Sequence, residues 1–119
     1  MRAIFRTVLF LSAGIAPIAV HAQWQPTDLS GYVAVNGAYL TDDSGWNYGM
    51  NFTVSNSGSV QACIYPRVTE ANNVTGQVAS GPVLLQPGES GVNIGQYIAA
   101  ADGEAWSVAV EATADNGCY

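Results

Sequence analysis

The side chains in this chain that could do chemistry are nine carboxylates and two cysteines. The chain has no lysine and a single histidine, His21, which lies in an N-terminal segment that we expect to be removed. Without histidine or lysine, no base activates a serine or cysteine nucleophile and no amine forms a Schiff base. A zinc or copper site is disfavoured for the same reason, and the sequence has no glycine-rich phosphate loop. We therefore expect no cofactor.

Carboxylates offer two other kinds of chemistry. A pair of them could hydrolyse a glycosidic bond. Oxygen atoms in the turns Asp42-Asp43-Ser44 and 102–104 could gather around calcium. The spacing of these acids matches no EF-hand loop, and acidic residues in turns are usually only solvated. We expect a protein that is not an enzyme and has no metal site.

The first 22 residues have the pattern of a secretory signal peptide. Arg2 and Arg6 precede an apolar segment, and Val20-His21-Ala22 has the small residues of a cleavage site. The apolar segment contains a glycine and a proline and is shorter than the roughly 20 residues that span a membrane. The sequence therefore predicts a signal peptide at 1–22 and one mature domain at 23–119. The mature domain would be exported to the periplasm or the cell exterior, with no membrane span.

The mature chain is strongly acidic. Removing the leader leaves nine acidic residues against one base, Arg67, so the formal net charge is −8. Nucleic acids and anionic membranes attract lysine and arginine patches, which this chain lacks. The charge fits a soluble protein that avoids non-specific binding, or one with a basic partner.

Cys63 and Cys118 predict one disulfide. Exported chains with an even number of cysteines commonly pair them, and a domain of 97 residues buries only a modest core. Closing this loop would stabilise the domain by about 4 kcal/mol in the chain-entropy model. Reactive thiols are the alternative, but there is no C-x-x-C motif and no mature histidine or lysine to lower a thiol pKa.

The stretch "SGWNYGMNFTVSNSGS" (44–59) alternates between apolar and polar residues. Successive side chains of a β-strand point to opposite faces, so one face is apolar and aromatic. The other face is small, polar and uncharged. We predict that Trp46, like Trp106 in the last strand, points into the core. The candidate binding residues on the polar face are Asn47, Asn51, Thr53 and Ser55.

Similar short runs continue to the C-terminus. We interpret Asn36-Gly37 as a turn or bulge, and we expect Pro66 at a sheet edge or a bulge because proline donates no ladder hydrogen bond. No convincing helical period appears after the leader. Six or seven strands at about 10-residue spacing predict an all-β fold, a small antiparallel sandwich. The clearest strands are expected at 31–40, 46–56, 60–69, 82–85, 92–98 and 105–114, with 70–80 a loop or a short strand.

The polar face of 46–56 has two interpretations. It is either the solvated outer face of a sandwich or a flat surface for an extended chain or a glycan. If this strand lay at a sheet edge, it would be a template for added strands. Trp24, in the lead-in, and the exposed tyrosines could instead hold a sugar ring. The candidate ligands are therefore an extended polypeptide or, as the alternative, a polysaccharide; a structural role at the cell surface is a third possibility.

Two segments resemble exported bacterial immunoglobulin-like domains: "NFTVSNSGS" (51–59) and "LLQPGES" (84–90). Cys63, then "VTGQVASGPVLLQPGES" and "DGEAWSVAVEATADNG", are also similar in order to features of the periplasmic inhibitors of curli amyloid assembly. This similarity covers about 60 residues and needs gaps. It implies an immunoglobulin-like β-sandwich and a non-enzymatic chaperone that keeps an amyloid-forming subunit soluble during export.

Overall fold

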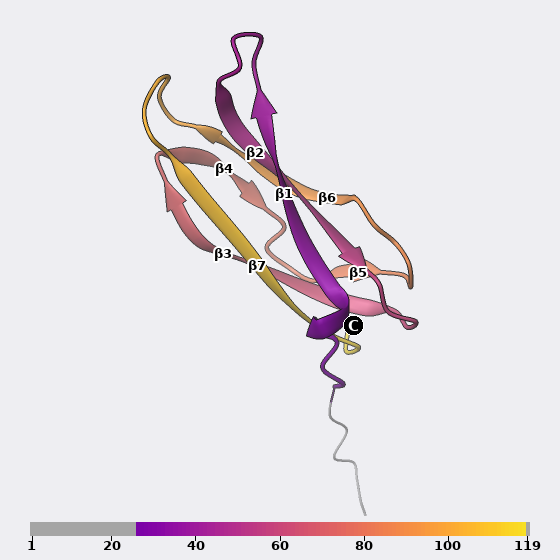
Figure 1. The fold of residues 1–119 in the computed structure, drawn as a ribbon. Coiled ribbons are helices and arrows are strands. Elements are labelled where there is room, and N and C mark those ends of the chain that lie inside the picture. The colour runs from indigo at the N-terminus through magenta and orange to yellow at the C-terminus, as the bar shows by residue number, and fades with distance from the viewer. Residues whose placement is uncertain (1–25, 119) are drawn as a thin grey trace, which may run out of the picture.

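The computed structural model describes residues 26–118, and within that range it contains strands, turns and one short 3-10 helix. The expected signal peptide and Trp24 lie outside the described residues. Seven strands and one disulfide confirm the all-β prediction. The elements in Figure 1 are η1 (Ser30–Tyr32), β1 (Val33–Thr41), β2 (Asn47–Asn56), β3 (Ala62–Asn72), β4 (Val74–Val78), β5 (Val83–Leu85), β6 (Val92–Ala99) and β7 (Ser107–Asp115).

The strands form two antiparallel sheets. Their orders are β1-β2-β6-β4 and β5-β3-β7. The first order corresponds to the A-B-E-D sheet of an immunoglobulin domain, and the β3-β7 pair corresponds to its C-F pair. The architecture is thus compatible with an immunoglobulin-like fold. Among residues 26–118, however, no named strand pairs with the outer side of β7.

The core lies between the two sheets. Phe52 and Val54 of β2 point inward, as the alternation predicts, and belong to the same buried cluster as Ile64 of β3. Each such side chain contributes roughly 1.5–3 kcal/mol when it is fully removed from water. The other buried apolar residues are Leu29, Ala62, Leu85, Ile94, Tyr97 and Ala114.

Pro66 lies in β3, the central strand of its sheet. At Pro66, however, β3 has a strand partner on one side only. It pairs with Ala112 of β7, while the pairing of β3 with β5 covers only residues 62–64. Ala114 directs its backbone groups away from β3, towards Leu29 and Ser30. By the antiparallel alternation, the ring nitrogen of Pro66 faces away from β7, beyond the end of β5. No neighbouring strand in the described sheet therefore needs a donor at this position.

Three sequence predictions are wrong. Asn36 and Gly37 form neither a turn nor a bulge, because both keep regular register with β2. A Cβ at Gly37 would lie 2.7 Å from the Met50 sulfur, so a larger residue there requires the Met50 side chain to move. Trp46 and Trp106 are not core residues: both are half-buried, and Trp106 precedes β7.

Gly95 controls the pairing of β4 with β6. It has a φ of +140°, and a Cβ there would lie 2.2 Å from the Gln77 carbonyl oxygen of β4. We expect Gly95→Ala to lower the free energy of unfolding by about 2 kcal/mol, because both the φ value and the overlap cost energy. Urea unfolding measures this, with faster amide exchange expected across β4. Gly81→Ala, which meets nothing within 4 Å, is the matched control; equal stability of the two variants would contradict the expected overlap.

Candidate functional site: an uncharged sheet edge and an aromatic cleft

The four strands of the β1-β2-β6-β4 sheet contain no charged residue. The charged residues that lie on strands are all on the other sheet, on β3 and β7, and the remaining acids of the described residues lie in the lead-in and the loops. Figure 1 shows this uncharged sheet as one layer of the sandwich. The charges on the opposite sheet are Arg67, Glu70, Glu111 and Asp115.

The outer face of the uncharged sheet displays amides and hydroxyls in rows. Asn51 of β2 pairs with Ala38 on one side and with Gln96 on the other. The Asn93 side chain donates to the Asn51 side-chain oxygen at 2.8 Å. Thr53 pairs with Asn36 and Asn93 in the next row, and Ser55 follows on the same face. The structure thus places Asn51, Thr53 and Ser55 together on a flat polar surface.

Asn47 is separated from this polar surface. It begins β2, where its side-chain oxygen accepts a hydrogen bond from the Thr41 hydroxyl at 2.8 Å. Its carbonyl oxygen accepts the Trp106 indole N–H at 3.0 Å. The structure therefore assigns Asn47 to the open end of the sandwich rather than to the row of Asn51.

The strand β2 is not an edge. It is hydrogen-bonded to β1 and to β6, so its backbone cannot receive an added strand. Within the described sheets, the open edge next to it belongs to β1, which has a strand partner on one side only. Sequence reasoning did not identify β1 as the edge strand, because the neighbours of β2 are set by residues distant in the chain.

The register of β1 shows which backbone groups face its open side. The Ser57 N–H donates to the Tyr32 carbonyl at 2.8 Å. Antiparallel pairs alternate, so residues 34, 36, 38 and 40 bond to β2. The backbone groups of Val33, Val35, Gly37 and Tyr39 therefore point to the open side.

This edge lacks the usual protection. Natural proteins guard sheet edges with charges, prolines, bulges or short strands. The strand β1 has nine residues with no charge and no proline, and its register is regular up to Leu40. By contrast, the outer edge of β7 is covered at its C-terminal end, where Leu29 N–H donates to the Ala114 carbonyl at 2.8 Å.

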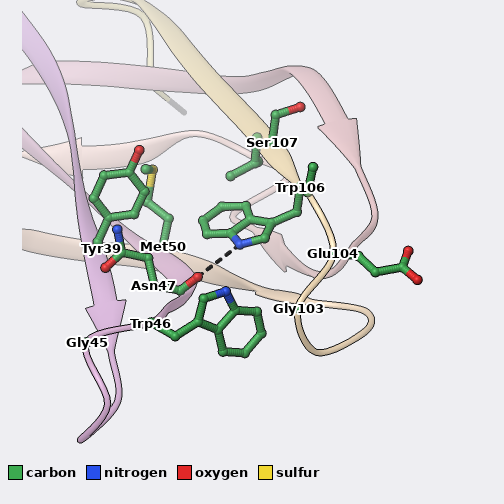
Figure 2. Close-up of a pocket in the computed structure, with 11 residues that line it drawn as sticks. Tyr39, Gly45, Trp46, Asn47, Met50, Gly103, Glu104, Trp106 and Ser107 are labelled. Carbon is green, nitrogen blue, oxygen red and sulfur yellow. Dashed lines mark hydrogen bonds between the residues drawn. The ribbon is translucent and has the colours of Figure 1, made fainter.

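An aromatic cleft of about 610 Å³ lies between the ends of β1 and β2 and the start of β7. Three rings line it: Tyr39, Trp46 and Trp106 (Figure 2). Met50 and Val108 contribute apolar surface to its lining. Tyr39 is 60% exposed, so the cleft opens to solvent.

Hydrogen bonds fix the Trp106 indole and organise the turn that precedes Trp46. The Trp106 indole is fixed to Asn47, and Tyr39 meets it edge to face with ring centroids 6.0 Å apart. The Asp42 carboxylate accepts hydrogen bonds from the Ser44 hydroxyl at 2.7 Å and from the Ser44 and Trp46 N–H groups. The Ser44 hydroxyl, followed by these backbone donors, lowers the pKa of Asp42. The turn that carries Trp46 is therefore organised by an ionised Asp42.

The Cys63–Cys118 disulfide is confirmed, with Cα atoms 5.2 Å apart. It connects β3 to the segment after β7 and leaves Cys63 fully buried. Next to it, the Thr27 N–H donates to the Asn116 side chain at 3.0 Å. The bridge thus fixes the C-terminal segment against the lead-in, at the opposite end of β7 from the aromatic cleft.

Comparison of the chain with protein-family models, with curated proteins and with solved structures finds no match. The assignment to the curli inhibitors therefore has no support beyond the compatible fold. Between residues 26 and 118, no helix is long and apolar enough to cross a membrane. The same residues contain no group of three or more metal-ligating side chains of the His, Cys, Asp or Glu type.

Proposed function

We propose that this protein is a non-enzymatic, exported binding module of a chaperone-like kind, which receives an extended polypeptide along the open edge of β1. The observation that carries the proposal is the unguarded edge of nine residues. Backbone hydrogen bonds to Val33, Val35, Gly37 and Tyr39 would supply affinity, in the manner of β-augmentation. The flat polar surface formed by Asn51, Thr53 and Ser55 would continue into the added strand.

An amyloid-forming subunit of the curli type is the proposed partner. Such a subunit assembles through unpaired strand edges, and a module that occupies one edge stops growth there. The proposal draws on the order of sequence features shared with the curli inhibitors. The net charge of −8 on the mature chain would keep the module itself from assembling edge to edge, through mutual repulsion.

A charge on β1 tests this directly. Ala38 is exposed on the outer face of β1, and Gln77 is exposed on the outer face of β4, at the other edge of the same sheet. With the mature chain added well below equimolar, we expect a strong delay in fibre growth of a curli-type subunit, followed by dye fluorescence. Ala38→Lys and Ala38→Glu should each remove most of the delay, because either charge guards the edge. Gln77→Lys and Gln77→Glu should keep it.

The outcomes separate the parts of the proposal. No delay with the parent chain contradicts inhibition of the amyloid subunit. A delay that survives both Ala38 variants contradicts β1 as the docking edge. If Ala38→Lys loses the delay and Ala38→Glu keeps it, the delay depends on attraction between the acidic module and its partner and not on the open edge of β1.

A polysaccharide is the second candidate ligand, because the aromatic cleft offers three rings of the kind that stack on sugars. Trp24, which the sequence suggests for this role, lies outside the described residues. Binding of insoluble polysaccharide by the parent, lost on Trp24→Ala or Tyr39→Ser, would favour this alternative.

A further inference from the structure

We propose that the aromatic cleft binds the cationic side chain of an arginine or lysine residue carried by the bound polypeptide. The inference rests on the proposed function and names the partner's chemistry at one position. In a strand added beside β1, the residue directly opposite Tyr39 projects its side chain to the same face of the sheet as Tyr39. That is the side on which Trp106 lies.

The rings form a site suited to a cation. An ammonium or guanidinium group within about 6 Å of an aromatic ring face is attracted by the ring quadrupole. Figure 2 shows Tyr39, Trp46 and Trp106 gathered around the cleft, with the Trp106 indole fixed by its hydrogen bond to Asn47. Because the Trp106 indole is already held, this ring needs little ordering when a side chain enters.

The charges around the cleft favour the same ligand. Gly45 and Gly103 line the cleft, so the turns that contain them flank it. These turns carry four exposed acids: Asp42, Asp43, Asp102 and Glu104. In Figure 2 the Glu104 side chain is directed away from the rings. These acids therefore attract a cation through their negative electrostatic field at the rim of the cleft, not through an ion pair with the bound group. Salt screens such a field.

No base competes for this field among residues 26–118. Arg67 is the one basic residue there, and it pairs with Glu111 at 3.1 Å on the opposite sheet.

Two polar groups at this cleft that could bind sugar hydroxyls already have hydrogen-bond partners. The Asn47 side-chain oxygen accepts from Thr41. The Ser107 hydroxyl is bonded to Glu70 at 2.6 Å. Specific sugar sites combine aromatic surface with several convergent hydrogen-bonding groups. Two of the polar groups at this cleft are thus already occupied, and its aromatic rings with acids in the flanking turns suit a cationic side chain.

The test compares N-acetyl-arginine methylamide with N-acetyl-citrulline methylamide, which has nearly the same shape and no charge. The readout is the assigned indole N–H signals of Trp46 and Trp106 in nitrogen-15 spectra of the mature chain. We expect saturable shifts with the arginine compound and at least about fivefold weaker binding of the citrulline compound. Tyr39→Ser should weaken arginine binding several-fold. Tyr32→Ser, which removes a tyrosine of similar exposure at the η1 end, should not.

Each contrary result overturns the inference. Equal affinity for the two compounds would contradict recognition of the positive charge. If neither compound shifts the indole signals, the cleft is not a binding site for this side chain. Tighter binding of a soluble oligosaccharide at the same indole signals would assign the cleft to sugars. This small-compound titration is independent of fibre inhibition. A delay of fibre growth with no arginine binding leaves strand addition at β1 standing, whereas arginine binding without any delay contradicts the proposed function alone.

Discussion

Replacing Cys63 and Cys118 with alanine is expected to lower the free energy of unfolding of the mature chain by about 4 kcal/mol. The disulfide joins residues separated by 55 positions, so its removal frees a long loop in the unfolded state. Domains of this size are stabilised by only about 5–15 kcal/mol in total. The variant should therefore unfold at a much lower urea concentration than the parent.

Reducing the disulfide of the parent separates the effect of the cross-link from the effect of the packing that alanine removes. Cys63 is fully buried, so alanine at this position also removes packing that the reduced thiol retains. We expect reductant to lower the urea midpoint of the parent and to leave the double-alanine variant unchanged. Amide exchange at Thr27 should accelerate in both reduced and variant proteins, because its acceptor Asn116 loses its anchor. A parent midpoint that does not move on reduction would contradict a stabilising role.

The sequence was sufficient for features that depend on local alternation. The inward side chains of β2, from Met50 to Val54, follow from a period of two residues, and so do Val108 and Val110 of β7. The disulfide followed from the presence of two cysteines in an expected exported chain. These inferences need no knowledge of which strands are neighbours.

The edge could not be predicted in this way. Whether β2 is an edge depends on β6, which begins 36 residues after β2 ends, at Val92. Alternation shows that Asn51 and Phe52 point to opposite faces, but it does not show what lies beside them in the sheet. Alternation therefore places the polar residues on the outer face of β2, while the open backbone belongs to β1.

Alternation also does not show whether a residue lies in the middle of the sandwich or at one of its open ends. Trp46 and Trp106 have the phase of core residues but lie at the ends of their strands, where the sheets no longer cover them. Tyr39 joins them from a third strand end. A usable sequence signal was the position of each tryptophan directly after an acidic, glycine-containing turn, at 42–45 and 102–105. Such turns cap a sandwich, so aromatic residues beside them line its end.

Replacing Asn56 with alanine is expected to destabilise the mature chain by about 3 kcal/mol. Asn56 is 2% exposed and ends β2 between two turns. Its amide donates to the Val60 carbonyl at 2.9 Å and lies within 3.4 Å of the Leu85 and Gln86 carbonyls. Its side-chain oxygen accepts the Gly58 N–H at 2.9 Å. Alanine removes these partners from the Val60 carbonyl and the Gly58 N–H, while the Gln86 carbonyl still accepts from the Glu89 N–H. Each buried group left unsatisfied costs about 1–3 kcal/mol.

Asn56→Asp distinguishes the lost donor from lost packing, because aspartate has the same shape. A carboxylate among three carbonyl oxygens is unfavourable, so the pKa of this acid in the folded protein should be raised above its unfolded value of about 3.9. The variant should therefore be closest to the parent in stability at low pH and lose stability as pH rises through the raised pKa. Urea midpoints at several pH values measure this, with Ser55→Ala, on the outer face, as a control expected to stay within about 0.5 kcal/mol of the parent. If the difference in urea midpoint between Asn56→Asp and the parent does not change with pH, the amide donor of Asn56 is not what stabilises the end of β2.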